Sequence, residues 1–389
     1  MCHGGTPRSR PWTFICFIVS ALIALGSFEA AAQAQRRSGA PLPNKPQLGT
    51  IGERLNANTI ALVSGNPNAT YMTIAYDLSA VLDDGDEFRI LPVIGKGGGQ
   101  NIKDVRFLKG VDLGITQSNL LPYFKRSNEI GQIDDKIVYI AKLFNEEMHL
   151  IVRADSGIKS LADLAGKKVN FSDVGSGTQL STRDIFEKLG IKPEEVNMGQ
   201  GDAIEALKRG EIAATILIAG KPAGAMAKLK ASEGFRILPV AFDRPLQADY
   251  LPTVLTSDDY PGLIGKGEKV ESVAVSAVLI AFNWPKGTDR YRRIQSFVDH
   301  FFPRLADFQK APRHPKWREA NLAAVLPGWK RFEGAEEWLR NREKVANSER
   351  EQFGAFLAQR VSKNAALSSE ERDRLFQEFL AWSKARERR

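Results

Sequence analysis

Strand-like and helix-like segments alternate along this 389-residue chain, and that alternation constrains its fold most strongly. Apolar runs typical of strands occur at residues 59–65, 88–95, 111–117, 167–173 and 213–220. Helix-like segments lie between or beside them, at residues 68–82, 99–110, 160–166, 178–189 and 201–210. Repeated strand–helix–strand units predict an α/β fold with mostly parallel sheets. In such sheets ligands bind beyond the carboxyl ends of the strands.

Two longer extended runs, residues 137–154 and 271–283, are almost continuously apolar. A chain of this length exceeds one ordinary core, which favours two lobes. The two long runs are therefore expected to cross between the lobes. Residues 287–330 are expected to be helical.

The N-terminal 34 residues have the pattern of a secretory signal peptide. Arg8 and Arg10 precede an apolar run at residues 12–28, and a small-x-small cleavage pattern ends at Ala34. The alternative is an uncleaved membrane anchor, for which the apolar run is slightly short. Residues 35–55, rich in Pro, Gly and charge, are expected to be a linker. We therefore expect an exported, periplasmic protein without membrane insertion after cleavage.

Composition narrows the possible partners. Both cysteines, Cys2 and Cys16, lie in the predicted signal, so the mature chain must be stabilised by its core without disulfides. The formal net charge is +8, but acidic and basic residues are interspersed and no cationic run with aromatic residues occurs. Nucleic acid is therefore a poor candidate partner, and small anions are better ones.

Motifs of common enzymes are absent from the sequence. The Gly-Lys pairs are not followed by Ser or Thr as a P-loop requires, and neither HExxH nor GxSxG occurs. We expect no enzyme activity, no cofactor and no metal site. His149 is expected to be a packed residue. Glu146-Glu147 lies near the presumed hinge; an exposed strand face is favoured for it, and contact with a ligand or a metal is left open.

Five loops at the expected strand ends share one chemistry. They are rich in Gly, Ser, Thr, Asn and Gln, which are neutral hydrogen-bonding groups, and lie at residues 64–70, 95–100, 117–119, 173–178 and 219–222. The loop Gly175-Ser176-Gly177-Thr178 stands between a strand and a helix N-terminus, where backbone amides and the helix dipole attract anions. These loops indicate a binding protein for a small anion.

The order of several motifs resembles the TAXI-type solute-binding receptors of TRAP (tripartite ATP-independent periplasmic) transporters. The motifs are "SGNPNATYMTIAYDL", "GGGQNIKDVRFLKG", "DLGITQSN", "HLIVRADSGIKSLADLAGKKVNFSDVGSGT" and "AGKP". Met72, Asn119 and Lys221 depart from the pattern of that family. The resemblance covers roughly residues 56–330.

This resemblance implies a type II periplasmic binding protein fold, with two α/β lobes joined by two crossing strands. Lobe 1 would comprise residues 56–152 and 273–332, and lobe 2 residues 153–272. It also implies capture of a small organic anion, of the dicarboxylate or acidic amino acid class, and its delivery to a TRAP-type permease. The ligand-binding residues it implies are Asn66, Thr70, Tyr71, Gly98, Gln117, Ser118, Ser176, Gly177, Thr178, Gln179 and Lys221. For Lys221 two positions stay open, toward a second ligand carboxylate or toward solvent.

Residues 333–389 lie outside the resemblance and form a C-terminal extension dense in Glu and Arg. Apolar residues at helical spacing predict two amphipathic helices, with Ser368 and Glu371 as a capping box before the second. We favour helices docked on the body or on each other over a partner-binding tail. The tail hypothesis supplies the alternative function, a periplasmic sensory or scaffold protein.

Overall fold

The computed structural model describes residues 50–67, 69–85, 87–360 and 368–387. The predicted signal peptide and nearly all of the predicted linker lie outside these residues. The last part of that linker is helical, because α2 spans Ile51–Asn58 and runs directly into the first strand.

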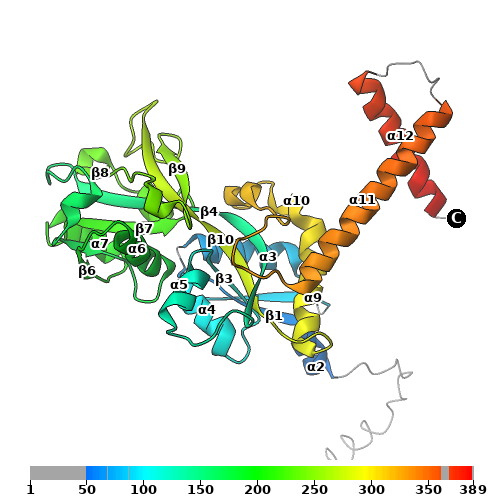
Figure 1. The fold of residues 1–389 in the computed structure, drawn as a ribbon, viewed down its shortest axis with the longest axis horizontal. Coiled ribbons are helices and arrows are strands. Elements are labelled where there is room, and N and C mark those ends of the chain that lie inside the picture. The colour runs from blue at the N-terminus through cyan, green and yellow to red at the C-terminus, as the bar shows by residue number, and fades with distance from the viewer. Residues whose placement is uncertain (1–49, 68, 86, 361–367, 388–389) are drawn as a thin grey trace, which may run out of the picture. The chain divides into compact units, whose positions relative to one another are not determined.

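One mixed sheet contains the ten strands of the described chain, in the order β2-β1-β3-β10-β4-β7-β5-β6, with β8 paired to β4 and β9 to β10 (Figure 1). The strands are β1 (Thr59–Val63), β2 (Arg89–Val93), β3 (Leu113–Gln117), β4 (Ile137–Arg153), β5 (Lys168–Asn170), β6 (Glu194–Val196), β7 (Ala214–Ala219), β8 (Phe235–Ile237), β9 (Leu251–Thr256) and β10 (Lys269–Phe282).

Helices connect these strands as the alternation predicted. The α-helices after α2 are α3 (Thr70–Leu82), α4 (Gly98–Phe107), α5 (Leu120–Ser127), α6 (Gly177–Lys188), α7 (Gln200–Lys208), α8 (Gly224–Ala227), α9 (Asp289–Phe301), α10 (Leu305–Phe308), α11 (Glu333–Arg360) and α12 (Ser369–Glu387). Short 3-10 helices are η1 (Leu161–Leu164), η2 (Ala231–Glu233), η3 (Arg244–Leu246), η4 (Phe302–Arg304) and η5 (Pro315–Glu319).

The two long strands β4 and β10 pair antiparallel and lie at the centre of the sheet. Strands β1, β2 and β3 run parallel to one another on one side of this pair. Strands β5, β6 and β7 run parallel on the other side. We call the part built on β1–β3 lobe 1 and the part built on β5–β7 lobe 2.

Two α/β lobes joined by two crossing strands confirm the predicted type II periplasmic binding protein fold. The lobe boundaries at residues 152 and 272 stay predictions, because β4 and β10 continue through them.

Each lobe has its own apolar core. In lobe 1, Phe297, Phe301 and Trp317 are fully buried under the sheet. In lobe 2, helix α6 contributes Ile185 and Phe186 to a cluster with β7. Burial of apolar surface on this scale is the main force that holds such a fold together, so the lack of disulfides in the described part is no obstacle.

The expectation that residues 287–330 are helical is wrong over much of the segment. Helix α9 ends at Phe301, and η4, α10 and η5 are single turns. Prolines at 303, 312, 315 and 327 explain the interruptions, since proline cannot donate within a helix interior. Side-chain hydrogen bonds anchor the segment instead: Asp77 of α3 accepts from the Trp317 indole at 2.9 Å and from the His314 amide at 2.9 Å.

The two predicted C-terminal helices are present as α11 and α12. The first turns of α11 pack on lobe 1, with Trp338 against Phe302 at a ring-centroid distance of 5.2 Å. Further along, Phe353 of α11 contacts Phe376 and Phe379 of α12 at 5.0 and 5.5 Å between centroids. The capping box is confirmed, because the Glu371 amide donates to the Ser368 hydroxyl and the Ser368 amide donates to the Glu371 carboxylate. The helices therefore dock on the body and on each other.

Candidate functional site

A cavity of about 680 Å³ is lined by residues of both lobes. Lobe 1 contributes the loop before α3, the loop before α4 and the end of β3, and lobe 2 contributes the loop before α6, the start of α7 and the end of β7. All of these segments follow strand ends, which is where α/β sheets bind ligands. A cavity of this volume is in the usual range for a small organic molecule.

The N-termini of four helices of nine or more residues, and that of the four-residue helix α8, open onto this cavity. Thr70 of α3, Gly98 of α4, Gly177 of α6 and Gln200 of α7 all line it. Helices α3, α4 and α7 have no side-chain cap. In the described part of the chain, no hydrogen bond uses the backbone amides of Gly98, Gly177 or Thr178. Uncapped amides and converging positive dipole ends make the cavity attractive to an anion.

The N-terminus of α6 is held on strand β7 of its own lobe. The Ser176 hydroxyl accepts from the Gln179 amide at 3.1 Å and so caps the helix. The Thr178 hydroxyl donates to the Ile218 carbonyl at 3.3 Å and accepts from the Ile218 amide at 3.0 Å. Side-chain bonds thus fix this helix on β7 and leave the Gly177 and Thr178 amides for an occupant of the cavity.

Glycine is required where α4 meets α6. A Cβ on Gly98 would lie 2.1 Å from the Gly177 Cα, and Gly98 has a φ of +43°. Neither the space nor the backbone conformation accepts a side chain there. The two glycine-rich loops therefore allow the lobes to touch beside the cavity.

Further polar contacts join the lobes along α6. The Gln100 amide donates to the Gly175 carbonyl at 2.9 Å. The buried Asn119 amide group donates to the Ser181 hydroxyl at 2.9 Å and to the Tyr250 hydroxyl at 2.9 Å. Asn119 thus serves contact between the lobes.

Glu146 of β4 is the buried carboxyl group of the cavity. It lines the cavity, and only 3% of its surface is exposed. Its Oε2 accepts from the Tyr71 hydroxyl at 2.5 Å and from the side-chain amide group of Gln117 at 3.1 Å. Burial raises the pKa of Glu146 to about 8, although both hydrogen bonds act to lower it. Burial likewise raises the pKa of Tyr71 well above its ordinary value, so this phenol stays a donor.

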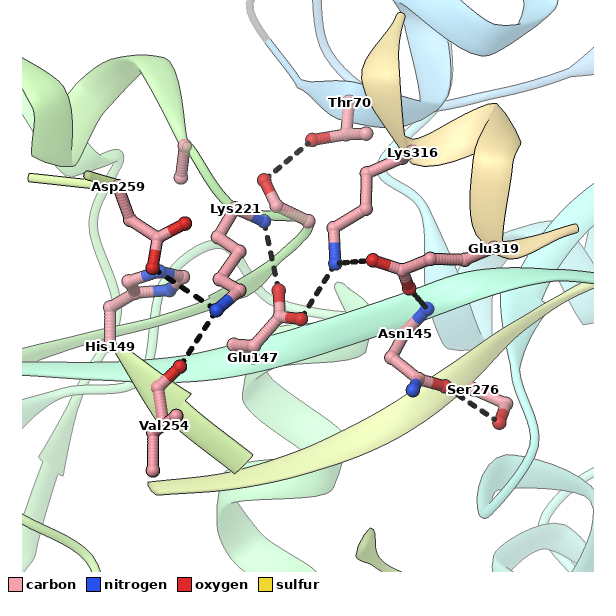
Figure 2. A network of polar contacts seen from close by, with 12 residues as sticks. Thr70, Asn145, Glu147, His149, Lys221, Val254, Asp259, Ser276, Lys316 and Glu319 are labelled. Atoms are coloured by element: carbon pink, nitrogen blue, oxygen red, sulfur yellow. Dashed lines mark hydrogen bonds and ion pairs between the residues drawn. The ribbon is translucent and has the colours of Figure 1, made fainter. Parts of the chain in front are cut away.

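The neighbouring Glu147 belongs to a different network, drawn in Figure 2. Its side chain is buried and accepts from the Lys316 ammonium at 2.6 Å and from the Lys221 amide at 2.8 Å. Lys316 also donates to Glu319 at 2.8 Å, and Glu319 accepts from the Asn145 amide at 2.8 Å. This network ties η5 of lobe 1 to the crossing strand β4 and to the end of β7.

The interpretation of Glu146-Glu147 as an exposed strand face is wrong. Both residues are buried, since successive side chains of β4 point to opposite faces and each face is covered. His149 is a packed residue as expected. Its Nδ1 bonds the Leu217 carbonyl at 3.1 Å, its Nε2 bonds the Tyr260 hydroxyl at 2.6 Å, and burial lowers the pKa of His149 to about 4.

Most of the residues predicted for the ligand site lie on the cavity. The cavity is lined by Asn66, Thr70, Tyr71, Gly98, Gln117, Ser176, Gly177 and Thr178. The remaining three, Ser118, Gln179 and Lys221, are outside its lining.

Their bonds explain these positions. The Ser118 amide donates to Ser276 in β10, and the Gln179 amide group donates to Glu195 at 2.7 Å. The Lys221 ammonium donates to the Val254 carbonyl at 2.7 Å and pairs with Asp259 at 3.1 Å (Figure 2).

Several lining residues escaped the sequence analysis. An exposed strand face is favoured for Glu146, and Lys96 lies in the expected loop at residues 95–100 but not among the predicted ligand-binding residues. Lys208 and Lys228 carry no local motif, and all three lysines are exposed and line the cavity. The start of α7 also lines the cavity, although the sequence pattern predicts only a helix at residues 201–210 there. A usable signal existed: the glycine pair of Gly199-Gln200-Gly201 precedes a helix in the same way as Gly175-Ser176-Gly177 does.

Comparison with known families decides the relationship of the chain. The model of the NMT1-like family matches residues 64–329, which include the whole cavity lining and both lobes except strand β1. The chain belongs to the NMT1-like family. The C-terminal helices α11 and α12 begin after the matched region.

Several solved structures are similar to this NMT1-like protein. The periplasmic aliphatic sulphonate binding protein SsuA of Escherichia coli is 22% identical, with a TM-score of 0.33, over 46% of this chain and 56% of that one. This chain thus spans little more than half of that protein's length. A putative sulfonate ABC transporter periplasmic binding protein of Methylobacillus flagellatus is 14% identical, with a TM-score of 0.41, over 70% and 76%. The ligand-binding component of an ABC-type import system of Staphylococcus aureus is 14% identical, with a TM-score of 0.40, over 65% and 74%.

Among the described residues, no helix has the length and apolar character needed to cross a membrane.

Proposed function

We propose that this NMT1-like protein is a periplasmic solute-binding receptor that captures a small organic anion between its lobes. The anion would belong to the dicarboxylate or acidic amino acid class, and its carboxylate would bind the amides of Gly177 and Thr178. The protein performs no chemistry on the ligand.

One observation carries the proposal: the N-termini of four helices of nine or more residues converge on one cavity between two lobes, and three of these four helices have no side-chain cap. An anion satisfies such amides without any counter-charged side chain. Lys96, Lys208 and Lys228 add positive charge along the wall and favour entry of an anion. The predicted signal peptide supports the periplasmic location, and the motif order supports a TRAP-type permease as the acceptor of the ligand.

The experiment is a thermal unfolding series on purified protein refolded to remove co-purified ligand. The panel is succinate, 2-oxoglutarate, glutamate and, as an oxyanion of different geometry, ethanesulfonate. A ligand present at 100 times its Kd adds about 2.7 kcal/mol to the free energy of unfolding. We expect a stabilisation of this size with at least one carboxylate. A panel without any effect would contradict the proposal.

A matched pair of variants tests whether the α6 N-terminus holds the anion. Ser176→Asp keeps a good N-cap but adds a negative charge inside the cavity, so the ligand-induced stabilisation should fall below about 1 kcal/mol. Thr288→Asp makes the same exchange at the N-cap of α9, where the Thr288 hydroxyl accepts from the Tyr291 amide at 3.2 Å, outside the cavity lining. That control should respond to the ligand as the wild-type protein does.

A second candidate function is a periplasmic sensor or scaffold on the same fold. The observation that favours it is the pair α11–α12, which begins after the family match and packs partly on itself through Phe353, Phe376 and Phe379. On this account a chain that ends at Arg342 would bind the anion but lose a protein partner in a pull-down. A pull-down that is unchanged by this truncation would remove the support for it.

A further inference from the structure

Glu146 is placed where an anion bound in the cavity would meet a carboxyl group. It lies on β4, it lines the same cavity as the helix N-termini, and 97% of its surface is buried. An ionised carboxylate at this position would repel an anion in a poorly solvated site. The placement therefore needs an explanation beyond packing.

The hydrogen bonds of Glu146 are distributed unevenly between its two oxygens. The Tyr71 hydroxyl and the Gln117 amide group both donate to Oε2, at 2.5 and 3.1 Å. No hydrogen bond of the described residues reaches Oε1. A carboxyl oxygen that accepts two donors is a poor place for a proton, so a proton on Glu146 resides on Oε1. Oε1 is then a donor available to the occupant of the cavity.

The surrounding groups keep this carboxyl group neutral near pH 7. Burial, the strongest influence, raises the pKa of Glu146 to about 8, and the adjacent Glu147 also raises it. Tyr71 of α3, Gln117 of β3 and the Lys316 ammonium of η5 lower it without reversing the effect of burial. Val275, the residue of β10 that pairs with Glu146, is uncharged. The cavity therefore presents a neutral acid to the anion and not a like charge.

We propose that Glu146 binds the captured anion as a neutral carboxylic acid, with Oε1–H donating to an oxygen of the ligand. This inference rests on the proposed function and makes ligand capture dependent on a proton. The ligand then accepts hydrogen bonds at both ends. One end accepts from the α6 amides, and the other accepts from Glu146. Such an arrangement suits a dicarboxylate or a keto acid.

The test is isothermal titration calorimetry of the full protein with succinate, 2-oxoglutarate and ethanesulfonate at pH 7 and at pH 9. These anions carry no amine and do not titrate in this range. Only protein in which Glu146 is protonated binds the anion, so the apparent Kd rises as the fraction of protonated Glu146 falls. With a pKa of about 8 for Glu146, the protonated fraction drops from about nine tenths to about one tenth, and binding should weaken about tenfold. At pH 9, binding should also be accompanied by the uptake of close to one proton per protein. This uptake is measured by comparing the binding enthalpy in buffers with different ionisation enthalpies.

Glu146→Gln is the informative variant. Its amide retains an acceptor for Tyr71 and Gln117 and offers an N–H in place of Oε1–H. It should bind with a Kd within about threefold of the wild-type value at pH 7, and the pH effect should disappear. Glu205→Gln makes the same Glu-to-Gln exchange at an exposed carboxylate that lines the cavity and pairs with Lys208, and it should keep the tenfold effect.

The outcomes separate the two proposals. Binding that is equal at pH 7 and pH 9, or a pH effect that survives in Glu146→Gln, overturns the role of Glu146 and leaves the receptor function intact. Binding that tightens at pH 9 with release of a proton means that Glu146 meets the ligand as a carboxylate, and also overturns it. No binding of any anion to the folded protein contradicts the receptor function and this inference with it.

Discussion

Lys316 has an ammonium group with almost no contact with water, and its position shows how single residues hold the two lobes together. Its side chain is 3% exposed and pairs with the equally buried Glu147 at 2.6 Å. Two charges removed from water are tolerated because each meets its partner and further hydrogen bonds, from Lys221 to Glu147 and from Lys316 to Glu319. The pair fixes η5 on the crossing strand beside the cavity.

We predict that Lys316→Met destabilises the protein by about 3–5 kcal/mol, because Glu147 is left as a buried charge without its partner. Urea denaturation measures the change in the free energy of unfolding. The control Lys310→Met, at an exposed lysine 3.9 Å from Asp307, should cost no more than about 0.5 kcal/mol. The double variant Glu147→Gln with Lys316→Met should recover most of the loss. A loss below about 1 kcal/mol for Lys316→Met would show that the Lys316–Glu147 pair does not hold η5 on β4.

Helices and strands differ in how far the sequence predicted them. The long apolar runs of β4 and β10 and the glycine-rich entry into α6 were recognisable because burial on both faces and helix starts leave strong local patterns. Strands β6 and β8 have three residues each, and β9 begins Leu251-Pro252 with two exposed positions, so no periodicity marks them. Glu146 and Lys316 were missed for a different reason. Their burial depends on partners that are distant in sequence, and no local pattern contains that information.

The C-terminal helices provide a prediction at the level of elements. Helix α11 contributes Ala335, Trp338 and Leu339 to the core of lobe 1, whereas its later turns contact α12. A chain that ends at Arg342 should therefore keep the thermal stability and anion binding of the full protein. A chain that ends at Phe332 should lose at least about 2 kcal/mol, because these apolar groups no longer cover the core. Equal melting temperatures for the two truncations would contradict this assignment.

For the whole molecule, two crossing strands and the contacts of α6 connect lobes that together enclose one cavity. The two strands join the lobes, and the polar contacts of Gln100 and Asn119 hold the lobes together beside the cavity. The cavity therefore forms only when both lobes are in place, as capture and release of a solute require. The family match covers residues 64–329 and thus includes the helix N-termini that line the cavity.

The most direct test of this account is a crystal structure of the protein grown with the panel anion that stabilises it most. We predict density for one anion per chain, with an oxygen within hydrogen-bonding distance of the Gly177 and Thr178 amides and a second oxygen near Glu146 Oε1. An anion bound only elsewhere on the protein, or an empty cavity at a saturating concentration, would contradict the claim that this cavity is the receptor site.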